Sequence, residues 1–402
     1  MRRTSTVALL VSLLAACSPA STGTPAPTTT ATASPPGPTS TPTITAAPSI
    51  TPSPRPASWT ETYSRELAAL SEVVAGPHGF IASGCTKDAS GNCLQGLLLT
   101  SPDGTSWTPV DLDGAADAQI SRLRWAGDRL FAIGLRIDND ARKIEPVVWT
   151  SLDGKSWSRS PVPSSTSLAI GDIIDSPLGT LAVGVHAPYA SEGSGFVVWH
   201  VAPDGALGAP TDVHPTDATF VTGAAWAGNR FLAWGAAGAL GEVQSTVLLD
   251  SADGKAWKAL PKVSKFNGRY VAQIAAFGDR LVAVGATSGT LPTSPRAWTS
   301  ADGTTWAAAA VPTDPGAMVT LAVEGQQLVS RGWEPVGAAD RPVTWSSPDG
   351  QAWTRLLPGD DMPDVAGFDG LYRAVVAGRA CVAATFAGDP AKPEPRAAIY
   401  CR

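Results

Sequence analysis

The most constraining feature of this sequence is an eight-residue phrase that recurs at a nearly fixed spacing. Its copies are TSPDGTSW (100–107), TSLDGKSW (150–157), DSADGKAW (250–257), TSADGTTW (299–306) and SSPDGQAW (346–353). The degenerate copy HVAPDGAL puts Asp204 in the gap, so that successive Asp-Gly pairs are separated by 50, 51, 49, 49 and 47 residues. Self-similarity at such a period indicates a repeat protein, in which each repeat folds as one supersecondary unit.

A second phrase lies between the copies of the first and has the pattern of a β-hairpin. It reads LRWAGDRLFAIG, IIDSPLGTLAVG, AAWAGNRFLAWG, IAAFGDRLVAVG and LAVEGQQLVSRG, and weaker versions near Val73 and Ala374 bring the number of units to seven. Two apolar, β-rich runs flank a short turn, and a glycine is expected to end the second strand. Together the two phrases give four short strands per repeat and no helical period.

The sequence therefore predicts an all-β chain folded as a single seven-bladed β-propeller of four-stranded blades. An all-β sandwich is the alternative, but a sandwich does not require a register of about fifty residues. The seventh unit ends at RAAIYCR without a fourth strand, whereas Ser58-Trp59-Thr60 resembles the fourth strand of the first unit, SWTPV. We expect the segment near Trp59 to pair with the C-terminal strand, because an open ring would expose edge strands.

Four cysteines fall into two local pairs. Cys381 and Cys401 lie opposite each other on adjacent strands of the predicted closing unit, and Cys85 and Cys93 bracket the corresponding loop of the first unit. Disulfides persist in exported proteins, so both pairs are predicted to be structural rather than metal ligands or nucleophiles.

The first 57 residues have the composition of an export signal and a stalk. Arg2 and Arg3 precede an apolar run that is too short to span a bilayer, and the following Leu-Ala-Ala-Cys17 resembles a bacterial lipobox. That resemblance implies a lipoprotein signal peptide at 1–17 with lipid on Cys17; an ordinary signal peptide with a chance cysteine is the alternative. Residues 18–57 are almost entirely Pro, Thr, Ser, Ala and Gly, which predicts a disordered stalk that holds the propeller (58–402) outside the cell membrane.

The pattern Ser-x-Asp-Gly-x-x-Trp resembles the Asp-box, or BNR repeat, of sialidases and several other propeller proteins. In such a turn the aspartate accepts hydrogen bonds from turn amides and from the preceding hydroxyl, and the tryptophan packs against the neighbouring blade. The resemblance places these turns between strands three and four, away from an active site, so we expect structural clips rather than catalytic residues. The residues assigned to them are Ser101, Asp103, Gly104, Trp107, Ser151, Asp153, Gly154, Trp157, Asp204, Gly205, Ser251, Asp253, Gly254, Trp257, Ser300, Asp302, Gly303, Trp306, Ser347, Asp349, Gly350 and Trp353.

The other repeated tryptophans belong to strands and are expected in the core or between blades. They are Trp149, Trp199, Trp298 and Trp345 on third strands and Trp125 and Trp226 on first strands. Trp333 is predicted where a second strand ends and a loop begins. With Tyr189 and Asp361 it is a candidate for the ligand face, which propellers build from the loops joining strands two to three and the loops joining blades.

Sialidase-like glycoside hydrolysis is the catalytic alternative. That chemistry uses three arginines on the sugar carboxylate, a Tyr/Glu pair and an acid/base aspartate. Arg136, Arg269 and Arg341, with Tyr270 or Tyr189, are weak candidates for it. The family's early Arg-Ile-Pro motif is absent, however, and catalytic sialidase domains have six blades.

Other chemistries have less support. None of the four histidines has a metal-site spacing, and Asp138-Asn139-Asp140 is only a fragment of a calcium loop. No phosphate-binding glycine loop or Gly-x-Ser-x-Gly motif occurs. We therefore expect no metal and no cofactor.

The layout resembles the photosystem II assembly factor type of seven-bladed propeller, which works at a membrane. The resemblance implies a non-catalytic binding or assembly module for a protein or glycan, anchored by Cys17. A net charge of −6, with no basic run in the folded part, argues against nucleic acid as a partner.

Overall fold

The computed structural model describes residues 58–402 except 139–142, 164–167, 187–194, 214–219, 238–244, 288–292, 338, 366 and 387–394. The predicted signal peptide and stalk, with Cys17, lie outside the described residues. Within them the chain is all β apart from one short 3-10 turn, η2 (Ser264–Phe266). No helix in this part of the chain is long and apolar enough to cross a membrane.

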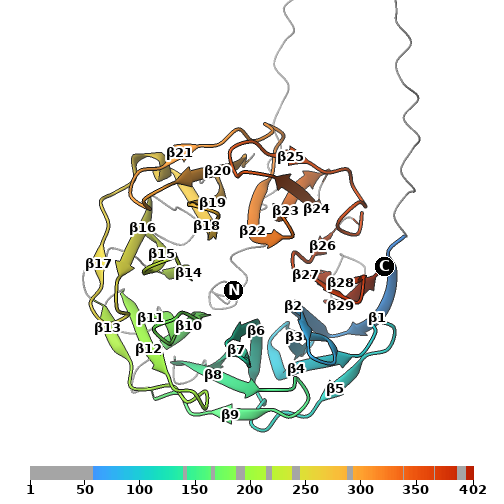
Figure 1. Ribbon diagram of the computed structural model, residues 1–402. Coiled ribbons are helices and arrows are strands. Elements are labelled where there is room, and N and C mark those ends of the chain that lie inside the picture. Colours follow the sequence, from blue (N-terminus) through green and yellow to red (C-terminus); the bar gives the residue numbers. More distant parts are fainter. Residues whose placement is uncertain are drawn as a thin grey trace, which may run out of the picture.

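Seven antiparallel sheets surround a common axis and form the predicted propeller (Figure 1). In each blade the first strand lies nearest the ring axis and the fourth lies at the rim (Figure 1). The strands of blades 1 to 3 are β2 (Ala68–Gly76), β3 (Gly79–Lys87), β4 (Cys93–Ser101) and β5 (Thr108–Val110); β6 (Ala118–Ala126), β7 (Arg129–Asp138), β8 (Lys143–Ser151) and β9 (Ser158–Ser160); and β10 (Leu168–Ile174), β11 (Thr180–His186), β12 (Phe196–Val201) and β13 (Thr211–Val213). Those of blades 4 to 6 are β14 (Phe220–Trp226), β15 (Phe231–Ala237), β16 (Ser245–Ser251) and β17 (Lys258–Ala259); β18 (Arg269–Phe277), β19 (Arg280–Thr287), β20 (Pro295–Ser300) and β21 (Ala307–Ala308); and β22 (Ala317–Glu324), β23 (Gln327–Val336), β24 (Ala339–Ser347) and β25 (Thr354–Arg355).

Blade 7 closes the ring with strands from both ends of the described chain. It contains β27 (Arg373–Val376), β28 (Arg379–Phe386), β29 (Arg396–Cys401) and β1 (Thr60–Glu66), and β26 (Phe368–Asp369) pairs with the far end of β28. β1 runs antiparallel to β29 with Thr60 opposite Cys401, which confirms the predicted closure beside Trp59. The disulfides Cys381–Cys401 and Cys85–Cys93 confirm both predicted cysteine pairs.

A β-bulge in the first strand of blades 1 to 6 gives the repeated glycine a different role from the one expected. The glycine does not end the second strand but lies inside it, opposite the bulge. A Cβ on Gly134 would lie 2.3 Å from the carbonyl oxygen of Gln119, and one on Gly285 would lie 1.8 Å from that of Tyr270. The bulge brings the backbone of strand one against strand two, so a side chain does not fit.

The hydrophobic core is divided into layers between neighbouring blades. Between blades 1 and 2, for example, Ile81 and Leu98 pack against Ile120, Leu130 and Trp149. The four third-strand tryptophans all lie in such layers, and none is more than 2% exposed. Burial of these large rings between blades stabilises the ring as a whole rather than any single sheet.

Trp125 departs from this pattern. Its side chain is 37% exposed near the end of β6, and its indole N–H donates to the carbonyl oxygen of Ala75 at 3.0 Å. Trp226, on the first strand of blade 4, is half-buried and packs edge-on against Phe231 at a centroid distance of 4.9 Å.

The Ser-x-Asp-Gly turns join third to fourth strands, and blade 5 shows their geometry. Asp302 accepts hydrogen bonds from the two amides that follow Gly303, at 2.8 and 2.7 Å, and from the Ser300 hydroxyl at 3.1 Å. The Ser300 hydroxyl oxygen accepts the Gly303 amide at 2.8 Å, and the Trp306 indole donates to the Gly303 carbonyl at 3.0 Å. Backbone hydrogen bonds of the same kind lower the pKa of Asp153 to about 2.

Each turn also contacts the preceding blade. A Cβ on Gly154 in blade 2 would lie 2.5 Å from Cδ1 of Ile81 in blade 1. Arginines at the start of second strands add polar contacts that the sequence analysis missed: Arg129 donates to the Pro203 carbonyl at 3.2 Å, and Arg230 donates to that of Asp302. Every one of these contacts joins one blade to the next around the ring.

Candidate ligand site

The loops that join second to third strands and the loops that join blades share one end of the ring, named here the loop face. Arg136 lies late in β7 of blade 2, Arg269 and Tyr270 begin β18 of blade 5, and Arg341 lies early in β24 of blade 6. The candidates therefore share the loop face but belong to three different blades, of which only blades 5 and 6 are neighbours. Within the described residues no shared carboxylate or hydrogen bond links the three arginines.

Two of these arginines already have partners close by in the chain. Arg136 donates to the carbonyl oxygens of Ala116 and Gly114 at 3.1 and 3.0 Å. Arg341 pairs at 2.5 Å with Glu334, which also binds Arg355 at 2.6 Å. Burial favours a raised pKa for Glu334, but the hydrogen bonds from Arg355 and Arg341 outweigh it and lower the pKa. This cluster ties together β23, β24 and β25.

The ligand-face candidates have different surroundings from those expected. Trp333 lies inside β23, opposite Ala317 and Pro342, because the second and third strands of blade 6 extend into what was expected to be a loop. Asp361 is only 12% exposed and pairs with the buried Arg331 at 2.7 Å. It therefore neutralises a buried charge instead of facing solvent. Tyr189, like Asn139 and Asp140 of the calcium-like fragment, lies outside the described residues.

The first strands bring a set of polar side chains to the ring axis that the sequence analysis missed. Glu72, Arg122, Asp172, Gln273 and Thr320 each follow the bulge directly, at the same register in five different blades. A first strand is the inner edge of its sheet, and its amides need partners from outside that sheet. Two of these side chains, Glu72 and Gln273, supply such partners.

Glu72 and Gln273 each cap the inner strand of the following blade. Glu72 accepts the Leu123 amide at 2.6 Å, and Gln273 accepts the Leu321 amide at 2.6 Å. These hydrogen bonds span neighbouring blades and satisfy amides that face away from their own sheets.

An ion-pair cluster at the axis connects blades 1, 2 and 3. Arg124 pairs with Glu72 at 3.1 Å and with Asp172 at 2.7 Å. Glu72 is 1% exposed and Arg124 is 22% exposed. Burial opposes the charge of Arg124, but the carboxylates of Asp172 and Glu72 raise its pKa well above the usual value. We call these three residues the axial ion cluster.

Two tyrosines and a second arginine accompany this cluster. Tyr372 directly precedes β27, and the charge of Arg122 acts on both Tyr372 and Tyr270. Burial raises the pKa of Tyr270 to about 12. Burial and the nearby charge of Glu72 also raise the pKa of Tyr372. In the described chain no hydrogen-bond partner is seen for either phenol or for the guanidinium of Arg122.

The sequence contains a signal for the two carboxylates of this cluster, though not for Arg124. When the repeats are aligned on their hairpin phrases, one column inside an otherwise apolar strand holds Glu72, Arg122, Asp172 and Gln273. Polar residues at a buried position of a repeat are candidates for function or for pairing. Their residue types differ from blade to blade, so the repeat does not reveal that they meet.

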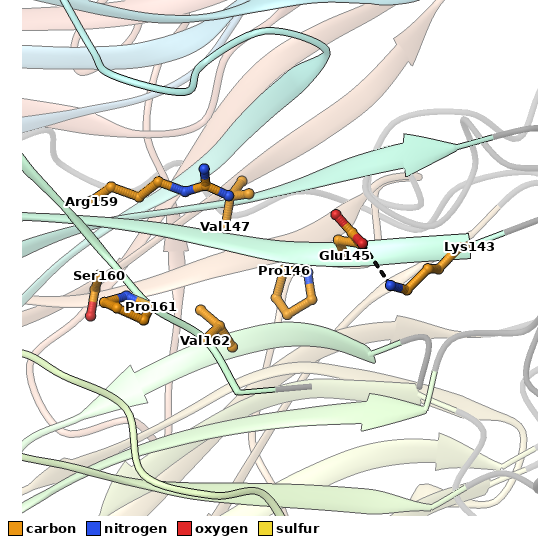
Figure 2. A pocket seen from close by; sticks show the side chains of 8 residues that line it. All are labelled: Lys143, Glu145, Pro146, Val147, Arg159, Ser160, Pro161 and Val162. Atoms are coloured by element: carbon orange, nitrogen blue, oxygen red, sulfur yellow. Dashed lines mark hydrogen bonds and ion pairs between the residues drawn. The ribbon is translucent and has the colours of Figure 1, made fainter. Parts of the chain in front are cut away.

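One hollow of the described residues lies away from the axis, at the outer strands of blade 2. Figure 2 shows its lining, which comes from β8, β9 and the residues that follow β9; its volume is about 440 Å³. Lys143 and Glu145 pair across its edge at 2.6 Å, while Pro146, Pro161 and Val162 form an apolar side. Among the described residues no group of three or more His, Cys, Asp or Glu side chains is arranged to hold a metal ion.

No protein-family profile and no curated protein matches the sequence. Among solved structures, the acylaminoacyl peptidase of Pyrococcus horikoshii is similar over 81% of this chain, with 12% identity and a TM-score of 0.50; this chain spans 50% of the peptidase. A Trypanosoma rangeli sialidase in complex with the inhibitor DANA is similar over 73% of this chain and 56% of its own, with 16% identity and a TM-score of 0.45.

The β-propeller domain of the Trilobed protease from Pyrococcus furiosus is similar over 66% of this chain and 77% of its own, with 11% identity and a TM-score of 0.41. Likeness at these identities concerns the fold alone. The activity has to be argued from the site.

Proposed function

We propose that this chain is a non-catalytic binding module of the extracytoplasmic surface, anchored to the membrane by lipid on Cys17. Its propeller presents the loop face to a protein or glycan ligand, and the stalk at 18–57 carries it clear of the membrane. A closed ring, with one disulfide inside blade 1 and one inside blade 7, supports this role, because it holds loops from distant parts of the chain on one surface. Lipid anchoring and a stalk are consistent with a partner in the cell envelope.

One observation supports the proposal that the module is non-catalytic: both partners of the Glu72 carboxylate are groups of the protein itself. This carboxylate accepts a backbone amide and the Arg124 guanidinium, and only 1% of it is exposed. A general base or an activating carboxylate has to reach its substrate or nucleophile with a free lone pair. Glu72 instead acts as a buried counter-ion between blades.

Glycoside hydrolysis is the second candidate, and one observation favours it. Tyr372 lies close enough to Glu72 and Arg122 for their charges to act on its phenol, and sialidase-like chemistry uses these residue types. Burial and Glu72 raise the pKa of Tyr372, however, whereas an activated nucleophile has a lowered pKa. We therefore place hydrolysis second.

Turnover separates the two candidates. The purified protein is incubated with fluorogenic glycosides, including a sialoside, and release is measured beside the Tyr372→Phe variant. We expect no release above background from either protein, together with retained binding in a screen of immobilised envelope glycans and envelope proteins. Release by the wild type that Tyr372→Phe abolishes would replace the binding proposal with hydrolysis.

The anchoring proposal has its own test. In a bacterial host that processes lipoproteins, the wild type should fractionate with membranes and Cys17→Ala should not. Mass spectrometry should find a diacylglyceryl group on Cys17. An unmodified N-terminal fragment, or equal membrane association of the variant, would contradict lipidation.

A further inference from the structure

Blade 5 carries a local excess of positive charge on an acidic chain. Between β17, which ends at Ala259, and Asp279 the sequence has no acidic residue and three basic ones, Lys262, Lys265 and Arg269. Between Arg280 and Asp302 its only charged residue is Arg296. Asp279 sits in the turn between β18 and β19, at the end of the blade opposite the loop face, and pairs with Arg280 at 3.4 Å. The loop face of this blade therefore has cations without local acids, although the chain as a whole has a net charge of −6.

The strand register places two of these cations together. Val271 lies opposite Gly285, which lies opposite Arg296, and Arg269 is two residues before Val271 on the same strand. Alternate residues of a strand and directly opposed residues share a face, so Arg269 and Arg296 extend from the same face of the sheet. Two strand spacings and two residue rises put their Cα atoms about 12 Å apart, a distance that two extended arginine side chains can bridge.

This face is directed toward blade 4. Val271 packs there against Leu232 and Trp234 of blade 4, and Trp298, two residues beyond Arg296, belongs to the same layer. Thr246 of blade 4 donates to the carbonyl oxygen of Arg269 at 3.5 Å. The two arginines therefore lie at the loop-face end of a rigid interface between blades, above its aromatic core.

Neither arginine has an acidic partner in the described residues. Arg269 donates through Nη1 to the carbonyl oxygens of Gly268 and Asn267, at 3.1 and 3.5 Å, and Arg296 donates through Nη1 to that of Pro295 at 3.2 Å. The Nε and Nη2 groups of both side chains have no acceptor in this part of the chain. Burial, followed by the charge of Arg269, lowers the pKa of Arg296, as expected for two cations without a counter-ion. Lys265 of η2, four residues before Arg269 in the sequence, is exposed and adds a third positive charge.

We propose that Arg269 and Arg296 form an oxyanion-binding site at the blade 4–blade 5 junction, which takes a carboxylate, sulfate or phosphate group of the loop-face ligand. The inference rests on the proposed binding function and names the chemical class of its ligand. The Nε and Nη2 edge of a guanidinium matches two oxygens of such a group, and a second guanidinium can bind the remaining oxygen. Lys265 supplies attraction at longer range.

The test uses small anions at constant ionic strength, so that general screening does not change. Sodium glucuronate, sulfate and phosphate are titrated separately into the full-length protein against sodium chloride as the reference. The Nε–H NMR signals of Arg269 and Arg296, assigned with Arg→Lys variants, report binding. The same titrations are run on Arg269→Gln, Arg296→Gln and the control Arg65→Gln, which removes one exposed positive charge on β1. Unfolding curves establish that each variant is folded.

We expect saturable shifts of both signals with at least one anion, and the anion that binds most tightly identifies the group. Arg269→Gln and Arg296→Gln should each weaken that Kd at least tenfold, whereas Arg65→Gln should leave it within twofold. Shifts that do not saturate, or equal weakening by all three variants, would overturn the site and leave only a general charge effect. A negative anion titration would overturn the oxyanion site but not the proposed binding function, which the glycoside turnover assay tests. Conversely, glycoside turnover by a protein that still binds anions would refute the binding function and keep the oxyanion site.

Discussion

Truncating Trp306 tests whether the Ser-x-Asp-Gly turns clip neighbouring blades together. The side chain is 4% exposed and lies in the layer between blades 4 and 5, with its ring centroid 5.4 Å from that of Phe266. Its indole N–H donates to the Gly303 carbonyl at 3.0 Å. A single substitution therefore removes both the apolar contact and the hydrogen bond.

The magnitude follows from the buried area. An indole buries about 200 Å², and at about 25 cal/mol per Å² its loss costs up to about 5 kcal/mol. Measured Trp→Ala substitutions in cores cost about 3–5 kcal/mol. Trp306→Ala should therefore lower the free energy of unfolding by about 3–5 kcal/mol. Trp306→Phe keeps most of the area and loses the hydrogen bond, so we expect a loss of about 1–2 kcal/mol.

Urea unfolding followed by circular dichroism gives the shift in midpoint. Trp125→Ala is the matched control, because this tryptophan is also on a blade but is 37% exposed and lies outside the Ser-x-Asp-Gly turns, and we expect it to cost less than Trp306→Ala. A Trp306→Ala midpoint that equals the wild type, or that equals the Trp125→Ala midpoint, would refute the clip interpretation.

Three further perturbations address the ring axis and the bulges. Glu72→Ala should cost about 3–5 kcal/mol in urea unfolding, because it leaves Arg124 with Asp172 as its remaining counter-ion and the Leu123 amide without an acceptor. Glu72→Gln, which can still accept that amide, should cost less. Gly285→Ala forces a Cβ to within 1.8 Å of a carbonyl oxygen and should cost more than about 2 kcal/mol, whereas Gly195→Ala, with no atom within 4 Å, should be nearly neutral in the same assay. The pKa of Tyr270 is raised from 10.0 to about 12; the folded state therefore retains this proton more strongly, so its contribution to stability is complete below pH 10 and is lost as the pH rises toward 12. Tyr270→Phe should make unfolding less dependent on pH in that window and remove the highest phenol titration seen by absorbance, and an unchanged titration would contradict the burial of this phenol.

Local pattern was enough to predict the fold. The strands are short, their turns are marked by Asp-Gly, and the hairpin phrase repeats at a nearly constant spacing, so each blade could be recognised separately. Ring closure followed from counting, because the seventh unit lacks a strand that the segment at Trp59 supplies. The disulfide Cys381–Cys401 followed from the same alignment, since it joins directly opposed residues.

Tertiary structure alone decided where the charged groups meet. Glu72, Arg124 and Asp172 are about fifty residues apart in sequence and differ in type, so the repeat hides their contact, and only closing the ring brings three first strands to one axis. Asp361 sits in a segment with the composition of a surface loop, yet it pairs with an arginine buried in β23. Arg269 and Arg296 become neighbours through the register of three strands. The sequence by itself determined the blades, because the strands and turns of one blade are specified by residues that are close together in the sequence. The candidate sites depend on side chains from different strands and blades, and only the folded ring sets the distances between them.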